Sequence, residues 1–460
     1  MDAAFSLADN VVNISYEDIP GEVRDVTKKC ILDTLAAILA GSTAENACKE
    51  IVELVKEGGG KEESTIIAYG GKVPSYMAAF ANGAMAHAAD YDDVHDDAKC
   101  HPSAHTIPAA FTVAERVGGV NGKEFIAAVA SGIDVVCRLG FSLTKKASEM
   151  GWFLPVVLGT FSSTAAAGRL LGLSKEQLVS AFGIAIHQTA GSHEMGTDIK
   201  SVIRAIRDAF SAKTGVLSAL MAQRGITGVE NSLEGKAGLF NLYFNGEYDP
   251  KPLTDDLGKK FEGINVSFKP WPSCRSSHSY IDATLGLVRE HDIKPEDVEE
   301  IMVTVNHHGQ AMVEPLEERR KPKLSIHAKL NVPFPISVAV VRRQVVIGDF
   351  LPEALKDPAV LQISEKVNYR LDPQLVGAGG MSPAVVEIKT KDGKLYSKRV
   401  DFAYGAPQNP LSMEDLIAKF RDCARYSAKP LSKDKVERVI GLVTKLEEVT
   451  DVSQIIQLLS

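Results

Sequence analysis

The densest group of potentially reactive side chains in this 460-residue chain lies in HAADYDDVHDDAKCHPSAH, residues 87–105, which holds four histidines and five aspartates. Three interpretations suit such a run. Imidazole and carboxylate groups bind zinc, iron or manganese. A histidine that an aspartate orients transfers protons near neutral pH. The third interpretation is an acidic loop that water solvates and that has no chemical role.

A metal site is the weakest of these interpretations. The chain contains neither HExxH nor a CxxC pair, the spacings that mark zinc sites. We therefore predict no metal, although side chains of the right types are present: His87, Asp90, Asp93, His95, His101 and His105.

We predict instead an acid/base pair of Asp90 and His101. Pro102 fixes the backbone beside His101, directly before the predicted helix TIPAAFTVAERVG. His101 and Ser103 are then expected near a helix N-terminus, a position that favours bound anions. Whether His87, His95 and His105 serve packing or function is left open.

Basic side chains lie in two other segments. Arg204 and Arg207 are three residues apart in KSVIRAIRDAFSAKTGVLSAL, so a helix places both on one face, where guanidinium groups match carboxylates. Lys269 and Arg275 lie in FKPWPSCRSSH, where two prolines stiffen the chain. We predict that these cations bind a small anionic carboxylate substrate, and that Lys269 is a catalytic residue that neutralises a carboxylate or donates a proton. The alternatives are an exposed basic face for the arginines and a rigid hinge with incidental charges for the second segment.

Helices that position these groups are predicted over residues 1–265. In GEVRDVTKKCILDTLAAILAG, apolar residues recur at steps of three and four, and Gly41 is expected to end the helix. Later segments such as GTFSSTAAAGRLLGLS are rich in small residues that let helices pack closely. Ser174 and Gln177 form a capping-box pattern at the start of another helix.

An α+β segment is predicted over residues 266–403. A helix is expected over 279–290, and EEIMVTVNH then alternates apolar and polar residues, as a half-buried strand does. Asp392 and Gly393 join two further strand-like runs, a pattern typical of a type I′ hairpin.

The C-terminal residues 404–460 are again predicted to be helical, with Ser412 as a helix cap. The simplest assembly returns this tail to the first helical region. We therefore predict a mainly α fold, in which both chain ends build a large all-helical domain and the α+β segment forms an inserted lid domain. A cleft between two such domains is a common ligand site.

Composition excludes several classes of function. A net charge of −8 disfavours binding to nucleic acid by neutralisation of phosphates. The six cysteines are scattered singly, which fits reduced thiols. The apolar runs are shorter than the roughly 20 residues of a membrane span, and the N-terminal residues do not read as a signal peptide. We expect a cytoplasmic protein with no nucleic-acid or membrane partner.

Several motifs in this order resemble the MmgE/PrpD family: HAADYDD followed by HPS, then AFSAKTGVLSALMAQRGITG, FKPWPSCRSSH and NPLS. The family includes 2-methylcitrate dehydratase, cis-aconitate decarboxylase and iminodisuccinate epimerase. The resemblance spans nearly the whole chain. It implies a homodimer without a cofactor, and a cleft lined by Asp90, His101 and Lys269.

The chain departs from the decarboxylase-like members of this family at three positions. Phe153 stands where such members carry a histidine, and Phe334 where they carry a tyrosine. Arg204 replaces a lysine. The resemblance therefore places Phe153 and Phe334 at the substrate, and the loss of two polar groups favours a more apolar substrate than cis-aconitate.

The expected reaction is proton transfer at a carbon next to a carboxylate, with His101 as base or acid. We predict a cofactor-independent lyase, a dehydratase of a hydroxylated di- or tricarboxylate. Epimerisation or decarboxylation of a related polycarboxylate is the first alternative. A metal-dependent hydrolase and a non-catalytic acid-binding protein are alternatives of other classes.

Overall fold

Helices dominate the fold, as the predicted mainly α class requires. The computed structural model describes residues 1–145, 147–196, 198, 201–375 and 383–460. These residues group into two compact units: a first unit of Met1–Val266 with Ser412–Ser460, and a second unit of Ser267–Leu411. The chain therefore leaves the first unit and returns to it at Ser412, where the sequence pattern had put the return at residue 404.

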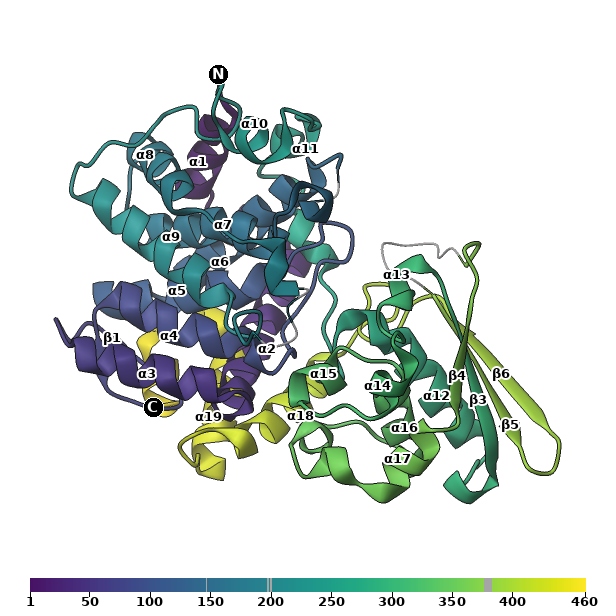
Figure 1. The fold of residues 1–460 in the computed structure, drawn as a ribbon. Helices are drawn as coiled ribbons and strands as arrows, with labels where there is room; N and C mark the ends of the chain where they lie inside the picture. Colours follow the sequence, from purple (N-terminus) through teal and green to yellow (C-terminus); the bar gives the residue numbers. More distant parts are fainter. Residues whose placement is uncertain (146, 197, 199–200, 376–382) are drawn as a thin grey trace. The chain divides into compact units, whose positions relative to one another are not determined.

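The first unit is built from helices of both chain ends. In Figure 1 the yellow C-terminal segment lies among the purple N-terminal helices, and α18 packs on α2. A small hairpin of β1 (Ser64–Thr65) and β2 (Lys72–Val73) joins α3 to α4. The helices of this unit are α1 (Ala3–Asn13), α2 (Gly21–Ala44), α3 (Asn46–Gly58), α4 (Ser75–Ala88), α5 (Pro102–Val117), α6 (Gly122–Phe141), α7 (Leu154–Leu170), α8 (Lys175–Ala185), α9 (Asp208–Gln223), α10 (Leu239–Phe244), α11 (Lys251–Thr254), α18 (Met413–Cys423), α19 (Lys433–Thr444) and α20 (Ser453–Leu458).

Small residues bring α4, α5, α7 and α9 close together, as the Ala-, Gly- and Ser-rich segments predicted. A Cβ atom on Gly215 of α9 would lie 2.3 Å from Cβ of Ser163 in α7. A Cβ atom on Gly83 of α4 would lie 3.0 Å from Cβ of Ala212 in α9. The helices that carry the reactive segments therefore pack at short, fixed separations, which larger side chains at these positions would not allow.

Gly41 does not end its helix. Helix α2 continues through it to Ala44, and a Cβ atom on Gly41 would lie 1.9 Å from the carbonyl oxygen of Met85 in α4. The glycine therefore permits the close approach of α2 and α4. The predicted caps are confirmed elsewhere, because Ser174 forms a capping box with Gln177 and Ser412 caps α18.

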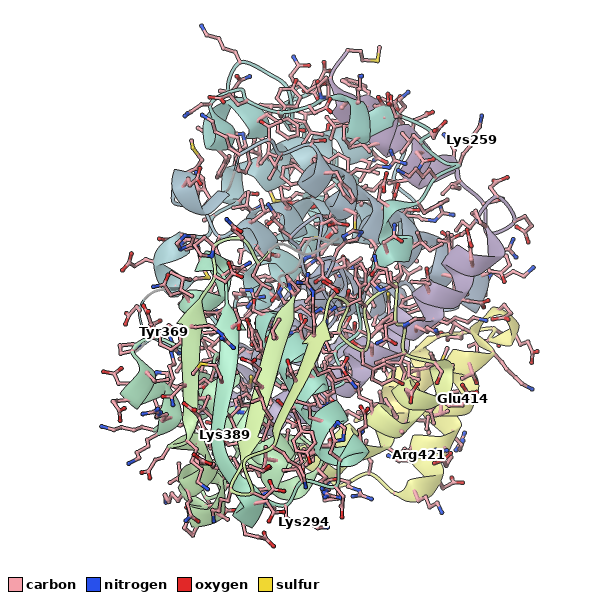
Figure 2. The ribbon with its side chains drawn as sticks, turned by 90° about the vertical axis from the view of Figure 1, so that its right-hand side faces the viewer. Lys259, Lys294, Tyr369, Lys389, Glu414 and Arg421 are labelled. Atoms are coloured by element: carbon pink, nitrogen blue, oxygen red, sulfur yellow. The ribbon has the colours of Figure 1, made fainter. Side chains whose placement is uncertain are left out.

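The second unit contains a four-stranded sheet in the order β4-β3-β5-β6. Strand β3 (Val298–Val305) pairs parallel to β4 (Val367–Leu371) and antiparallel to β5 (Ala384–Thr390), which pairs antiparallel to β6 (Leu395–Val400). Figure 2 turns the strands toward the viewer, with Tyr369 on β4 and Lys389 on β5. The other face packs on α12 (His278–Glu290) and α16 (Pro333–Arg342), and the shorter helices are α13 (His307–Gln310), α14 (Leu316–Arg320), α15 (Ser325–Lys329) and α17 (Pro358–Ser364).

The β5–β6 hairpin forms where it was predicted, but its turn is not type I′. A type I′ turn needs a positive φ at both central residues, and of Asp392 and Gly393 only Gly393 has one, at 86°. The amide of Gly393 donates to the carbonyl oxygen of Thr390, and the amide of Thr390 donates to that of Lys394. This pattern matches a longer loop with glycine in the left-handed position of a bulge.

Among the helices of the described residues, none combines the length and the apolar character that crossing a membrane requires.

Candidate active site

The segment between α4 and α5 brings the reactive side chains of the first unit together. Helix α4 ends at Ala88, and Asp90 follows in the left-handed conformation, with φ of 52° and its amide donating to the carbonyl oxygen of His87. Aspartate tolerates this conformation better than most residues do. The chain then crosses to α5, where His101 is the residue just before the first helical turn. His87 and His101 therefore flank the same loop, His87 at its start and His101 at its end.

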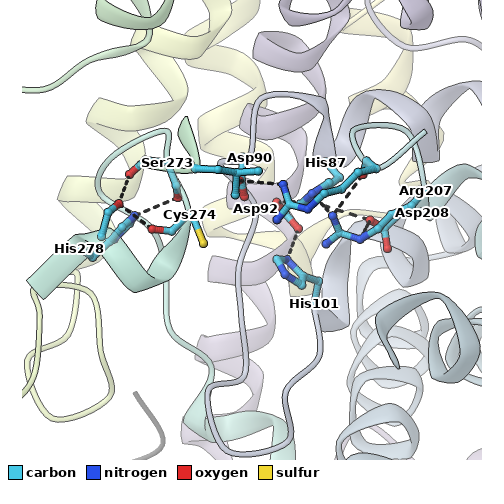
Figure 3. A network of polar contacts seen from close by, with 12 residues as sticks. His87, Asp90, Asp92, His101, Arg207, Asp208, Ser273, Cys274 and His278 are labelled. Atoms are coloured by element: carbon cyan, nitrogen blue, oxygen red, sulfur yellow. Dashed lines mark hydrogen bonds and ion pairs between the residues drawn. The ribbon is translucent and has the colours of Figure 1, made fainter. Parts of the chain in front are cut away.

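Asp92 bridges these two histidines (Figure 3). Its Oδ1 atom lies 2.7 Å from Nδ1 of His87, and its Oδ2 atom lies 2.7 Å from Nδ1 of His101. The carboxylate is fully buried, whereas 17% of the His101 side chain is exposed. Because a carboxylate accepts, each Nδ1 carries the proton that it donates, and Nε2 of His101 is left as the basic nitrogen.

The predicted pairing of Asp90 with His101 is therefore corrected, since Asp92 is the carboxylate at hydrogen-bond distance from this ring. The Oδ2 atom of Asp90 lies 3.9 Å from a guanidinium nitrogen of Arg204. The physical reason is the left-handed turn at Asp90, after which Asp92, two residues further on, faces the imidazole.

His87 is held neutral by its surroundings. The guanidinium group of Arg207 donates to Nε2 of His87, while Nδ1 of the same ring donates to Asp92. Burial, together with the charge of Arg207, lowers the pKa of His87 from 6.5 to about 3. His87 therefore orients Asp92 and does not exchange protons near neutral pH.

Arg204 and Arg207 lie just before α9, not within it as the pattern of their segment had predicted. Amide-to-carbonyl bonds between residues three apart, such as Ala205 to Val202, coil this stretch more tightly than an α-helix. Arg207 is almost fully buried, and its Nε atom lies 3.5 Å from Oδ2 of Asp208. Burial lowers the pKa of Arg207, and the charge of Asp208 opposes that shift.

The ring of Phe153 lies against the guanidinium group of Arg207. Its ring centroid is 5.1 Å from the guanidinium carbon of Arg207, a distance at which a cation interacts with an aromatic face. Phe153 precedes α7, and its amide donates to the carbonyl oxygen of Gly191. The ring therefore presents an apolar surface beside a buried cation.

The N-terminus of α5 is occupied by a side chain of the protein itself. Asp93 accepts from the amide of Ser103 at 3.2 Å and bonds the Ser103 hydroxyl as well. Burial and the nearby charge of Asp33 raise the pKa of Asp93 from 3.8 to about 8. The anion site expected around Ser103 is thus filled by Asp93.

The other two histidines of the segment have structural partners. The amide of Ala98 donates to Nδ1 of His95, whose Nε2 atom lies 3.0 Å from the carbonyl oxygen of Glu262. Nδ1 of His105 lies 2.9 Å from the hydroxyl oxygen of Ser162 in α7. These contacts fasten the segment to its neighbours, as a packing role requires.

Within the described part of the chain, His87, Asp92 and His101 are close enough to hold a metal ion, with ligand atoms within 4.8 Å of one another. The hydrogen bonding argues against it. Arg207 only donates, so Nε2 of His87 is the accepting nitrogen and Nδ1 carries a proton that blocks metal ligation. A dication would also lie near the charge of Arg207. The three residues fit a proton-transfer group better.

Three predicted residues belong to the second unit. Lys269 lies between Phe268, whose amide donates to the carbonyl oxygen of Gly405, and Pro270. Arg275 donates to the hydroxyl of Ser267 at 3.4 Å. Phe334, which was predicted to lie at the substrate, is fully buried in the hydrophobic core of this unit, near Phe350. Its surroundings are those of a packing residue.

Sequence reasoning missed Asp92 as the residue that organises this site. Asp92 and Asp93 stand together in DYDD, and nothing in their spacing distinguishes one from the other or from Asp90. The sequence signal for His87 would be a helix that ends just after it, because His87 lies in the last turn of α4 and so at the edge of the loop.

Comparisons with known proteins match this chain over most of its length. The model of the MmgE/PrpD N-terminal domain matches residues 6–251, and that of the MmgE/PrpD C-terminal domain matches residues 271–447. A human cis-aconitate decarboxylase is 29% identical and aligns over 99% of this chain and 94% of its own length. The cis-aconitate decarboxylase-like protein oryM of Aspergillus oryzae is 27% identical over 98% and 95%, and a cis-aconitate decarboxylase of Aspergillus terreus is 25% identical over 97% and 94%.

Proposed function

Because this chain belongs to the MmgE/PrpD family and is an enzyme of lyase type, we propose that it eliminates a group from a polycarboxylate by proton transfer at a carbon next to a carboxylate. His101 moves the proton. The observation that carries the proposal is the 2.7 Å contact between Asp92 and Nδ1 of a partly exposed His101.

The chemistry requires such a pair. A proton on a carbon next to a carboxylate is only weakly acidic, so its removal needs a positioned base and fixed positive charge for the negative charge that develops. Nε2 of His101 takes this proton. Asp92 holds the ring in the right tautomer and stabilises the imidazolium that forms. In a dehydration, the same imidazolium then protonates the departing hydroxide, so that water leaves and a carbon–carbon double bond forms.

Arg204 is the proposed carboxylate ligand of the first unit. Its side chain is 16% exposed, whereas that of Arg207 is 1% exposed and donates to His87. Arg207 then supplies positive charge without direct contact. Lys269 and Arg275 of the second unit remain predicted ligands of the substrate carboxylates. The homodimer and the lack of a cofactor remain predictions that rest on the family resemblance.

The proposed substrate is a hydroxylated di- or tricarboxylate with an apolar substituent. Phe153 supports the apolar substituent, because its ring covers one side of the Arg207 guanidinium group and offers no hydrogen bond. A second candidate reaction is decarboxylation, which the names of the relatives favour. There His101 would deliver a proton to the carbanion left by loss of carbon dioxide.

A panel assay tests the proposal and separates the candidates. The purified enzyme is incubated with hydroxylated and unsaturated di- and tricarboxylates, while alkene absorbance and released carbon dioxide are followed. Alkene formation supports dehydration, and carbon dioxide release supports decarboxylation. Exchange of a carbon-bound proton without either product identifies an epimerase. Thermal stabilisation by an acid that is never converted identifies a binding protein and contradicts the proposal.

A further inference from the structure

A lysine from the C-terminal segment reaches the loop that carries Asp92. Lys419 lies on α18, and only 4% of its side chain is exposed. Its Nζ atom lies 2.6 Å from Oδ1 of Asp33 in α2 and 2.6 Å from the carbonyl oxygen of Tyr91. The same ammonium group lies 3.7 Å from the centroid of the Tyr91 ring. All of these residues belong to the first unit.

The contact with Tyr91 matters because Tyr91 directly precedes Asp92. A peptide group is planar, so fixing the carbonyl oxygen of Tyr91 also fixes the direction in which the chain enters Asp92. The ring contact holds the side chain of Tyr91 at the same time. Lys419 therefore constrains the residue before Asp92 through both its backbone and its side chain.

A purely stabilising role does not account for this arrangement. Removing a lysine and an aspartate from water is costly, and replacing a buried ion pair by apolar side chains is often neutral or stabilising. What apolar side chains cannot replace is the donor to the carbonyl oxygen. The arrangement therefore points to control of the loop rather than to stability alone.

We propose that Lys419 is a positioning residue for the Asp92–His101 pair, acting through the backbone of Tyr91. Asp33 supplies the counter-charge to the ammonium group in the interior. The inference rests on the proposed function, since the positioned group is the proposed base, but the geometry of the loop can be measured without any substrate.

The experiment compares Lys419→Met, the double variant Asp33→Asn with Lys419→Met, and Lys28→Met as the control. The single variant removes the ion pair of the buried Asp33 with Lys419 and is expected to unfold at a lower temperature. The double variant removes both charges, so its melting temperature should return toward that of the wild type. Lys28 is a matched control, because it is a largely buried lysine of α2 that pairs with Asp25 and Glu447 away from the loop.

Two readouts are taken from each variant. One is the imidazole ¹⁵N chemical shift of His101 without substrate, which reports whether Nδ1 still carries the proton. The other is kcat and KM for the best acid of the panel. In the double variant we expect a changed His101 shift and a kcat lower by about tenfold to a hundredfold, the cost of misplacing a catalytic group, with little change in KM. Lys28→Met should match the wild type in both.

A folded double variant with the wild-type His101 shift and the wild-type kcat would overturn the inference. If no acid of the panel is converted, the proposed function fails, and the chemical shift alone then decides whether Lys419 positions the ring.

Discussion

Replacing Asp92 by asparagine should disable the site while leaving the fold intact. Asp92 accepts one hydrogen bond from His87 and one from His101, each at 2.7 Å. Asparagine has nearly the same shape as aspartate, but an NH₂ group, which donates, replaces one of the two carboxylate oxygens. Arg207 holds His87 in the tautomer that donates from Nδ1, so the amide oxygen should stay on the His87 side. The NH₂ group then faces His101.

The magnitude follows from the bond that is lost. A hydrogen bond to a charged group contributes about 1.5–3 kcal/mol, which corresponds to a fall in kcat of roughly tenfold to 150-fold. An NH₂ group that faces Nδ1 also favours the tautomer that carries its proton on Nε2. That tautomer cannot act as the base, so the fall should lie at the upper end of the range.

The assay measures kcat and KM of Asp92→Asn on the acid that the panel identifies. Imidazole ¹⁵N shifts of the free enzyme report the tautomer of His101 independently, with the His101 signal assigned from a His101→Gln variant. Asp97→Asn is the control, because it makes the same chemical change at an exposed position of the same loop. Its kinetics and shifts should equal those of the wild type.

The reasoning is refuted if folded Asp92→Asn keeps kcat within about twofold of the wild type, a difference of less than half a kcal/mol. It is equally refuted if His101 still carries its proton on Nδ1, because the carboxylate would then have no part in setting the tautomer.

Two further predictions concern pH and metals. Burial lowers the pKa of His105 from 6.5 to about 3, so below pH 6.5 the unfolded chain takes up a proton that the folded chain does not, and the free energy of unfolding falls as the pH drops toward 3. Urea unfolding of His105→Asn should depend less steeply on pH over this range, and an unchanged slope would contradict the assigned pKa. Treatment of the enzyme with a chelator, followed by dialysis, should leave turnover unchanged. Elemental analysis should then show far less than one equivalent of zinc, iron or manganese per chain. Activity that is lost on chelation and restored by one of these metals would reinstate the metal interpretation.

Local features of the fold were predictable because they depend on neighbouring residues. The alternation of Ile301, Val303 and Val305 placed strand β3 correctly, since a strand buries every second side chain. The caps at Ser174 and Ser412 were also visible, because a capping side chain bonds a backbone amide three residues away.

Features that depend on tertiary contacts were not predictable in this way. Gly41 looks the same in the sequence whether it ends a helix or lets α4 approach α2. Asp90 and Asp92 are equally good partners for a histidine on paper, and only the left-handed turn at Asp90 decides which of them faces His101. Lys419 and Tyr91 are 328 residues apart in the sequence, a separation that no local pattern spans.

The central claim is that Nε2 of His101 transfers a proton at a carbon next to a carboxylate. The most direct measurement incubates the enzyme in D₂O with the acid that it converts and follows deuterium at that carbon, in substrate and product, for the wild type and for His101→Gln. We predict deuterium incorporation by the wild type and a rate lower by about a hundredfold to ten thousandfold for the variant, the range that loss of a general base produces. An unchanged rate in folded His101→Gln would show that another group transfers the proton and would contradict the account.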